Sequence, residues 1–258
     1  MGTALITGAS SGIGLDLARL FANDKHDLVL VARNESALGQ VARECRARHG
    51  VKVVVLPQDL SHPSAPDEIF AALGQQGVAI DFLVNNAGFG AQGAFAKVDL
   101  KTHLDILQVN VVALTHLTRL FLPGMVGRGR GRILNVASTA AFAPGPYMSV
   151  YYASKAYVLS QSVALARELR QTGVTVTALC PGPTKTAFQE RANMGGAKLF
   201  RAGMMTSEAV ALAGYRGFMR GKSFVIPGAA NKASAWAGRV VPWGLVSRVT
   251  ASLNRGRE

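Results

Sequence analysis

Three side chains in the middle of the chain could act together on a carbonyl group. Ser138 follows Ile133 to Ala137, an apolar run that predicts a strand, and Tyr151 and Lys155 lie in a segment that predicts a helix. Residues four apart share one helix face, so the phenol and the amine would be neighbours. Ser138 could donate a hydrogen bond to a carbonyl oxygen while Tyr151 delivers a proton to it. Lys155 would lower the pKa of Tyr151 from its ordinary value of about 10.

A tyrosine and a lysine at this spacing have a plainer interpretation. The pattern Y-x-x-x-K is common on helices, where it usually places a half-buried ring beside a solvated amine. The chemical interpretation therefore depends on what the rest of the chain builds around the pair.

The N-terminal segment predicts a turn that binds a dinucleotide. Thr3 to Thr7 reads as a strand, GASSGIG follows, and LDLARLFAN has helical apolar spacing. Glycines in this context permit a tight turn and close approach of a phosphate, and the helix N-terminus favours a pyrophosphate. A plain strand-turn-helix is the alternative. The residues expected to bind the cofactor here are Gly8, Ser10, Ser11, Gly12, Ile13 and Gly14.

The end of the next strand suggests which dinucleotide is bound. Asp27 to Ala32 reads as a buried strand, and Arg33 follows it. An acidic residue at this place would bind the ribose hydroxyls of NAD(H), whereas a guanidinium suits the 2′-phosphate of NADP(H). The sequence therefore favours NADP(H), although Arg33 could also be an exposed residue at the start of a helix.

Polar residues follow two further strands. Asp59 and Leu60 come after the strand Val51 to Leu56, and Asp59 could accept a hydrogen bond from the adenine amino group or cap the next helix. The strand Asp81 to Val84 runs into two asparagines, which could brace the sheet, line the cofactor cleft, or do both. The expected cofactor-binding residues after that fourth strand are Asn86, Ala87 and Gly88.

Asn110 lies inside a long amphipathic helix expected over Leu104 to Leu122. Asparagine is neutral to unfavourable within a helix, so a local task for this side chain is expected.

The second half of the chain adds two strands and one weakly patterned segment. The helix from Tyr151 should continue to about Arg170, and strands are expected at Val174 to Cys180 and Ser223 to Ile226. The residues expected to reach the cofactor after the first of these strands are Pro181, Gly182, Thr184 and Thr186. The segment from there to about Thr206 reads either as a substrate lid or as disordered chain.

Seven strands alternating with helices indicate an α/β fold with a doubly wound parallel seven-stranded sheet of Rossmann type. We find no internal repeat and no linker that divides the chain, so residues 1–228 are expected to form a single dinucleotide-binding catalytic domain. Ligands of such sheets bind at the carboxyl ends of the strands, where the polar residues named above all fall.

Together these motifs resemble those of the short-chain dehydrogenase/reductase family over about residues 2 to 228. The chain has T-G-x-x-x-G-x-G at Thr7 to Gly14, N-N-A-G at Asn85 to Gly88, and P-G followed by Thr186. Asn110, Ser138, Tyr151 and Lys155 complete the pattern.

The resemblance implies a role for each member of that set. Tyr151 would be the acid/base, Ser138 would fix the carbonyl, and Lys155 would also hold the nicotinamide ribose. Asn110 would support its helix and a water leading to Lys155. Tyr152 does not fit the pattern, because the residue four positions on is Ala156.

Composition limits the compartment and the partners. The 258 residues are 49% hydrophobic, and the chain does not start with a basic region followed by a long apolar run. No stretch reads as long and apolar enough to span a membrane, and the two cysteines match no metal spacing, so we expect a cytoplasmic protein without a metal.

The net charge of +13 could attract nucleic acid, an anionic membrane or an acyl-carrier partner, but solvated basic faces are the simplest explanation. The run GRGRGR is too short and lacks aromatic residues, so nucleic acid is not an expected partner.

We expect residues 229–258 to form a helical extension at the C-terminus. Pro242 and Gly244 should break it into one helix before Val241 and one after Leu245, with Leu245, Val249 and Leu253 in a single stripe. That stripe could pack on the protein's own core, on a second subunit, or on a membrane, which would make the location peripheral.

Two classes of function remain open from the sequence. The first is an NADPH-dependent reductase of a mainly apolar ketone, aldehyde or β-ketoacyl compound, forming a homo-oligomer (dimer or tetramer). The second is a regulatory protein that binds NADP(H) without turnover. The complete set of four residues around Tyr151 favours the enzyme.

Overall fold

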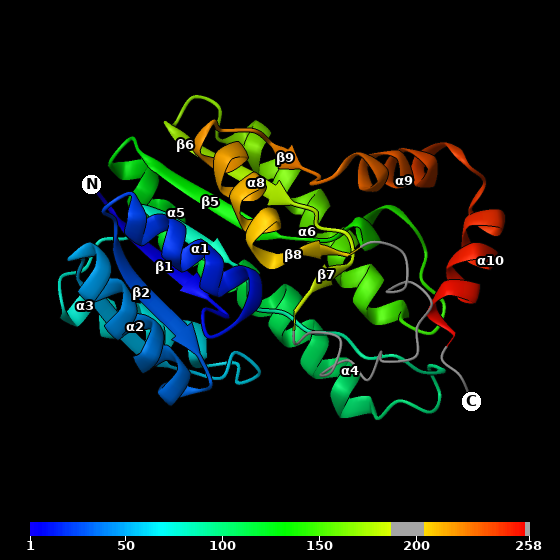
Figure 1. The fold of residues 1–258 in the computed structure, drawn as a ribbon, viewed down its shortest axis with the longest axis horizontal. Coiled ribbons are helices and arrows are strands. Elements are labelled where there is room, and N and C mark those ends of the chain that lie inside the picture. Colours follow the sequence, from blue (N-terminus) through cyan, green and yellow to red (C-terminus); the bar gives the residue numbers. More distant parts are fainter. Residues whose placement is uncertain (187–203, 256–258) are drawn as a thin grey trace.

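A fully parallel seven-stranded sheet forms the centre of the molecule (Figure 1). The computed structural model describes residues 1–186 and 204–255. The strands lie in the order β3-β2-β1-β4-β5-β6-β9, which confirms the predicted fold class. Their bounds are β1 (Thr3–Thr7), β2 (Asp27–Ala32), β3 (Val53–Pro57), β4 (Phe82–Asn85), β5 (Gly131–Val136), β6 (Val174–Leu179) and β9 (Phe224–Val225).

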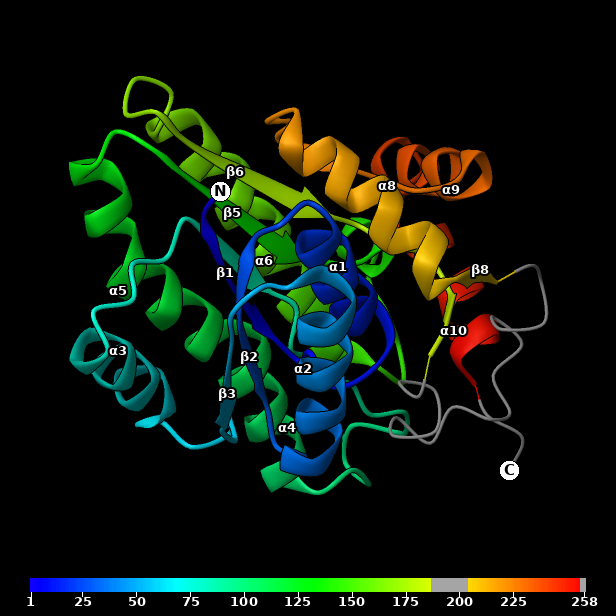
Figure 2. The same cartoon turned by 60° about the vertical axis from the view of Figure 1, so that its left-hand side comes forward.

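Helices cover both faces of this sheet. Figure 2 shows α3 and α5 on one side of the strands and α1, α2 and α8 on the other. Each side has its own apolar core, one containing Phe21 and Phe218 and the other containing Ile69 and Phe121. The helices that flank the sheet are α1 (Gly12–Asn23), α2 (Glu35–His49), α3 (Ala65–Gln75), α5 (Leu114–Gly127), α6 (Ser149–Glu168) and α8 (Ser207–Met219).

The strand order places a ligand site between β1 and β4. These two strands pair directly, while β2 and β3 lie beyond β1 and β5 lies beyond β4. The chain therefore runs outwards from β1 through β2 to β3, and then outwards from β4 through β5 and β6 on the other side. In doubly wound sheets ligands bind where the strand order reverses in this way, outside the carboxyl ends of the strands.

The strands match the expected ones closely, with shifts of one or two residues at their ends. The largest shifts, of two residues, are at the starts of β3 and β5. Strand β3 begins at Val53 instead of Val51 because pairing with β2 starts between Leu28 and Val53. Strand β5 begins at Gly131 instead of Ile133 because its pairing with β6 already starts at Gly131. Val51 is nevertheless buried, so its apolar character reflects packing next to the strand.

The expected single helix around Asn110 is a composite. It begins as α4 (Leu100–Leu107), continues as a π-helical stretch η1 (Gln108–Ala113), and ends as α5. The run Leu100–Gly127 is long and apolar enough to cross a membrane by length and composition, so the expectation that no stretch qualifies was wrong. Because 44% of its most apolar window is buried inside the protein, the run also fits the core helix that its packing indicates.

Asn85 braces the sheet, and the next asparagine faces the cleft. The Asn85 amide donates to the oxygens of Thr118 (3.1 Å) and Asn135 (2.9 Å), and Asn135 in turn donates to Ser162 (2.9 Å). This buried chain of hydrogen bonds joins β4 and β5 to α5 and α6. Both alternatives for the asparagine pair therefore hold, one for each residue.

The weakly patterned segment is described only at its ends. Thr184–Lys185 (β7) pairs in parallel with Met205–Thr206 (β8), which closes a small second sheet. The proposed lid falls mostly on residues 187–203, which lie outside the described residues.

The C-terminal extension forms two helices, α9 (Ala229–Val240) and α10 (Trp243–Asn254), at one end of the molecule (Figure 1). The break at Pro242 was expected, but Gly244 lies within the first turn of α10 instead of ending a helix. Helix α9 packs on η2 (Thr139–Phe142), where a Cβ at Gly238 would lie 2.5 Å from the carbonyl oxygen of Phe142. One side of the extension therefore packs on the chain itself.

The expected stripe on α10 is divided between two faces. Leu245 and Val249 are exposed, whereas Leu253 turns inward. Because each residue advances about 100° around a helix, each step of four adds roughly 40°, and the third member of the stripe has rotated towards the core.

Candidate active site

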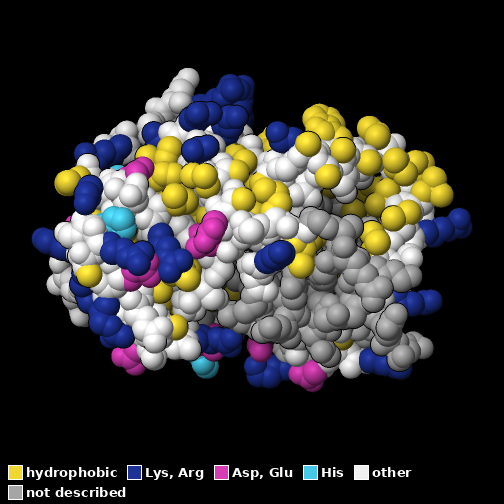
Figure 3. Space-filling model, in the orientation of Figure 1, with side chains coloured by type: hydrophobic (Ala, Val, Ile, Leu, Met, Phe, Trp, Pro, Cys, Tyr) yellow, Lys and Arg dark blue, Asp and Glu magenta, His cyan; other side chains and the backbone are white. Residues whose placement is uncertain are grey.

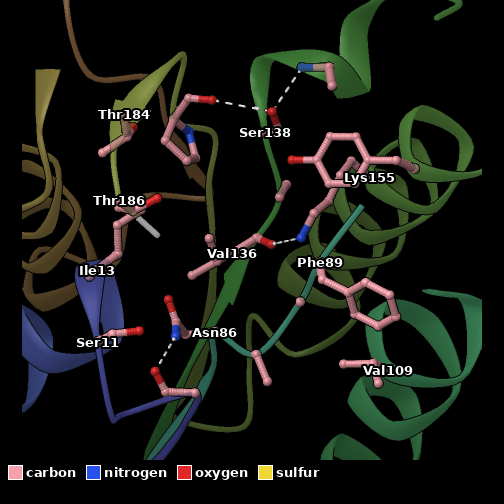
Figure 4. A pocket seen from close by; sticks show the side chains of 18 of the residues that line it. Ser11, Ile13, Asn86, Phe89, Val109, Val136, Ser138, Lys155, Thr184 and Thr186 are labelled. Atoms are coloured by element: carbon pink, nitrogen blue, oxygen red, sulfur yellow. Dashed lines mark hydrogen bonds between the residues drawn. The ribbon is translucent and has the colours of Figure 1, made fainter. Parts of the chain in front are cut away.

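A cavity of about 580 Å³ lies at the carboxyl ends of the strands (Figure 4). Ser11, Ile13 and Asn86 lie on one side of it and Ser138 and Lys155 on another, as Figure 4 shows. The structure brings most of the expected site residues to its wall. They are Gly8, Ser10, Ser11, Gly12, Ile13, Arg33, Asp59, Leu60, Asn86, Ala87, Gly88, Ser138, Tyr151, Lys155, Pro181, Gly182, Thr184 and Thr186.

Two expected residues, Gly14 and Asn110, do not line this wall. A Cβ at Gly14 would lie 2.4 Å from the Gly8 carbonyl oxygen and from Asn86 Nδ2. Gly14 is therefore needed for close packing behind the turn, so the helix can approach the strand without a side chain between them.

The glycine-rich turn is tied to β4 by side-chain hydrogen bonds. Asn86 Nδ2 donates to the carbonyl oxygen of Thr7 at 2.8 Å, and Thr7 Oγ1 accepts from the backbone N–H groups of Asn86 and Ala87 at 3.0 Å each. Gly8 has φ +66° and Gly12 has φ +55°, both in the region that favours glycine. Thr7 was expected only as the first residue of the glycine motif, without this bracing role.

The first helix presents its N-terminus to the cavity. Helix α1 begins at Gly12 with Ser11 as its N-cap, and both residues line the wall. Unpaired backbone N–H groups and the helix dipole make such an end favourable for a phosphate. The residues present therefore fit the pyrophosphate of a dinucleotide.

Arg33 and Asp59 face each other at the ends of β2 and β3. Arg33 Nη1 lies 3.8 Å from Asp59 Oδ2, and the arginine side chain is 71% exposed. Burial raises the pKa of Asp59, but hydrogen bonds from Ser61 and the charge of Arg33 outweigh it and bring the pKa below its ordinary value. Asp59 does not cap α3, whose N-cap is Ser64, so this alternative was wrong.

Ser138 is fixed at the end of β5 by its own loop. It is the N-cap of η2, and its Oγ accepts from the Ala140 N–H at 3.1 Å and lies 3.3 Å from the Pro181 carbonyl oxygen. The hydroxyl is 9% exposed and opens on the cavity.

Lys155 is buried beneath the same end of the cavity. Its Nζ donates to the carbonyl oxygen of Val136 at 2.8 Å and lies 5.8 Å from the centre of the Tyr151 ring. Burial lowers the pKa of Lys155 to about 8. The amine therefore changes its charge close to neutral pH.

The pKa of Tyr151 moves in the direction opposite to the sequence expectation. Burial raises it to about 12, and the hydrogen bond with Ser138 opposes this only in part. No lowering of this pKa by Lys155 offsets the burial, and the amine donates instead to the Val136 carbonyl oxygen. Tyr151 is thus a neutral hydroxyl at pH 7.

Asn110 acts on the backbone beside the cavity. Its Nδ2 donates to the Phe89 carbonyl oxygen and to Ser154 Oγ, both at 3.0 Å, and its Oδ1 accepts from the Phe89 N–H at 3.1 Å. A Cβ at Gly88 would lie 3.0 Å from Asn110 Oδ1 and 3.2 Å from Lys155 Nζ. Asn110 therefore positions the loop after β4, while the water implied by the resemblance stays a prediction.

Tyr152 and three residues of the extension line the cavity without having been assigned to it. Tyr152 was set aside because it fails the Y-x-x-x-K pattern, yet it is buried at the wall and its hydroxyl donates to Asn254 Oδ1 at 3.3 Å. The extension contributes Ser234, Thr250 and Leu253. The sequence signals for α10 were the break at Pro242 and the stripe of Leu245, Val249 and Leu253, and neither indicates what the helix faces.

The comparisons with known proteins agree with this geometry. A family model described as short chain dehydrogenase matches residues 2–195. Ketoacyl reductase HetN of Nostoc sp. is 38% identical over 214 residues, which are 81% of this chain and 72% of that protein.

Two solved structures share the fold over nearly the whole chain. A short-chain dehydrogenase from Sphingobium yanoikuyae in complex with NADPH superposes with a TM-score of 0.84 at 36% identity, covering 92% of this chain and 93% of its own. A short-chain dehydrogenase/reductase from Burkholderia phymatum in complex with NAD gives a TM-score of 0.82 at 27% identity, covering 91% and 92% respectively. Relatives of this chain thus include both NADPH-bound and NAD-bound proteins.

Proposed function

The chain belongs to the short-chain dehydrogenase family, and on this basis we propose that it is an NADPH-dependent oxidoreductase acting on a carbonyl or secondary alcohol. One observation carries the proposal: Ser138, Tyr151 and Lys155 meet at one end of a cavity whose other end holds the glycine-rich turn and Arg33. A protein that only sensed the cofactor would have no need of a proton donor at the far end.

The nicotinamide ring would supply the hydride, and the side chains of this chain would manage the oxygen and the proton. Ser138 donates a hydrogen bond to the carbonyl oxygen. Tyr151, protonated at neutral pH because its pKa is about 12, donates the proton. Lys155, with its pKa near 8, carries positive charge at pH 7 and stabilises the tyrosinate that forms. In the reverse direction the same groups remove the proton from an alcohol.

We propose NADP(H) as the cofactor because Arg33 lies at the end of β2. Its side chain is exposed and extends towards the cavity wall beside Asp59. A guanidinium there can bond a 2′-phosphate at two oxygens, whereas NAD(H) offers only a hydroxyl. The NADPH complex of the Sphingobium relative supports this choice.

The proposed substrate is a mainly apolar ketone, aldehyde or β-ketoacyl compound. Beyond Ser138 the cavity wall includes the apolar side chains of Ala140, Ala143, Met148 and Leu253, which favour apolar surface on the substrate. Similarity to a ketoacyl reductase points in the same direction. The proposed state is a cytoplasmic homo-oligomer, a dimer or a tetramer.

Consumption of NADPH with a panel of ketones, aldehydes and β-ketoacyl thioesters tests the proposal. We expect turnover with at least one apolar carbonyl compound, a lower rate with NADH, and loss of turnover in Tyr151→Phe with NADPH binding intact. Binding of NADPH without turnover on the whole panel would favour the regulatory protein and contradict the enzyme.

A further inference from the structure

The outer face of the C-terminal extension is apolar. Val240, Trp243 and Val249 are 77%, 72% and 59% exposed, and Trp236 and Leu245 are also exposed. We call these five residues the α9–α10 patch. Figure 3 shows apolar side chains gathered over α9 and α10, with no Asp or Glu side chain drawn among them. A contiguous exposed patch of this kind marks a surface that binds something.

Helical spacing separates the outer face from the packed face. On α9, Lys232, Trp236 and Val240 are four residues apart and exposed, while Ala235 and Gly238 are buried against the core. On α10, Thr250 is held by the Pro144 carbonyl oxygen at 2.8 Å, and Asn254 Nδ2 donates to the Pro146 carbonyl oxygen at 3.1 Å. The inner faces of α9 and α10 are therefore fixed to the rest of the protein, and the patch lies on their opposite, exposed faces.

The positive charge of the extension indicates which kind of surface binds the α9–α10 patch. Residues 229–258 contain five Lys or Arg residues and a single acidic residue, the terminal Glu258. Lys232, Arg248 and Arg255 are exposed beside the patch. A two-fold contact between copies would place these cations against their own counterparts, which is unfavourable. An anionic surface would be attracted instead.

The shape of the patch favours lipid over an acidic protein. The patch lies on two short helices at one end of the molecule (Figure 1), and its side chains are exposed. A protein partner would need a complementary, closely packed surface, whereas fluid lipid adapts to projecting side chains. Exposed tryptophans with basic neighbours suit the boundary between headgroups and acyl chains.

We propose that the α9–α10 patch docks the protein on an anionic lipid bilayer. Thr250 and Leu253, on the inward face of the same helix, line the cavity. Docking would therefore place the substrate end of the cavity next to the lipid. The binding itself does not require the proposed reductase activity.

Both tryptophans of the chain lie in the patch, so tryptophan fluorescence, excited selectively over tyrosine, reports on this surface alone. The full chain is mixed with vesicles of phosphatidylcholine, with or without phosphatidylglycerol, in the absence of cofactor and substrate. We expect a blue shift and co-sedimentation with the anionic vesicles only. Absence of binding to them, or equal binding to both, would overturn the proposal.

Variants separate the contributions of apolar surface and charge. The double variant Leu245→Ser with Val249→Ser should weaken binding by at least about a hundredfold, since two buried aliphatic side chains contribute roughly 3 kcal/mol or more. Arg248→Gln should weaken it roughly fivefold, from about 1 kcal/mol per surface cation. Leu104→Ser, an equally exposed leucine on α4, is the matched control and should bind as the unaltered chain does.

Measurement of the oligomer mass decides between lipid and a second copy. We expect the mass of the double variant to equal that of the unaltered chain. A lower mass in the double variant, together with unchanged vesicle binding, would assign the patch to self-association and overturn the proposal.

Discussion

The two ends of the cavity are built in different ways. The cofactor end consists of backbone turns at the ends of neighbouring strands, with Thr7 and Asn86 holding the glycine-rich turn against β4. The substrate end combines the loop after β5 with a helix about a hundred residues further along the chain. Thr250 and Asn254 of that helix donate hydrogen bonds to the carbonyl oxygens of Pro144 and Pro146. Parallel strands bring their ends together wherever the sheet forms, whereas the second arrangement depends on particular side chains.

This difference determines which changes should affect which end. Backbone N–H groups hold a phosphate with little dependence on side-chain identity, so the cofactor end should tolerate substitutions outside its glycines, Arg33 and the bracing pair Thr7 and Asn86. The substrate end depends on buried side chains with specific partners, so single substitutions there should change substrate binding and leave cofactor binding intact.

The largest effect is expected at Tyr151, where the two ends meet. Tyr151→Phe removes the proton donor, and general acid catalysis contributes about a hundred- to ten-thousandfold to the rate. The turnover number should fall by this factor while the Kd for NADPH stays constant, as steady-state kinetics and fluorescence titration would show. Tyr157→Phe on the same helix is the control. An equal loss in Tyr152→Phe would contradict the assignment of Tyr151 as the donor.

The burial of Lys155 should make the free energy of unfolding depend on pH. Its pKa of about 8 in the folded chain is below the ordinary 10.5, so between these values the unfolded state binds more protons and stability rises with pH. Relative to Lys155→Met, the free energy of unfolding of the unaltered chain should increase by up to about 3 kcal/mol from pH 7 to pH 11. Chemical denaturation at several pH values measures this. Lys97→Met, at an exposed lysine, should show no such trend, and a flat difference for Lys155→Met would refute the depressed pKa.

Arg33 should control the cofactor preference without affecting the chemistry. A charge-assisted hydrogen bond contributes roughly 1.5–3 kcal/mol, or about ten- to a hundredfold in affinity. Ala32→Asp combined with Arg33→Ala should shift preference from NADPH towards NADH by this factor, measured as the ratio of kcat/KM values. Arg43→Ala on α2 is the charge-matched control. If the unaltered chain already uses both cofactors equally, the role given to Arg33 is wrong.

The sequence predicted the cofactor end far better than the substrate end. Strands, glycines and strand-end residues such as Asn86 and Ser138 have local patterns, and parallel topology converts these into one site. The pKa of Tyr151 could not be predicted, because its burial and the bond from Lys155 to Val136 depend on tertiary packing. Tyr152 and Leu253 carry no local signal either, since their meeting depends on the path of α9 and α10.

The smallest expected effect tests whether α10 serves the substrate end alone. Asn254 is fully buried, accepts from the Tyr152 hydroxyl at 3.3 Å, and donates to the Pro146 carbonyl oxygen at 3.1 Å. Asn254→Ala removes both bonds, each contributing roughly 0.5–1.5 kcal/mol, and loosens the helix that carries Thr250 and Leu253.

The KM for an apolar substrate should therefore rise several-fold, while the Kd for NADPH should not change, because α10 is held by hydrogen bonds to Pro144 and Pro146 at the substrate end of the cavity. Ser252→Ala, at an exposed position on the same helix, controls for helix propensity. A parallel loss of NADPH affinity in Asn254→Ala would mean that the two ends are coupled through α6, whose Tyr152 and Lys155 lie less than one turn apart. The separation between a backbone-built end and a side-chain-built end would then not hold.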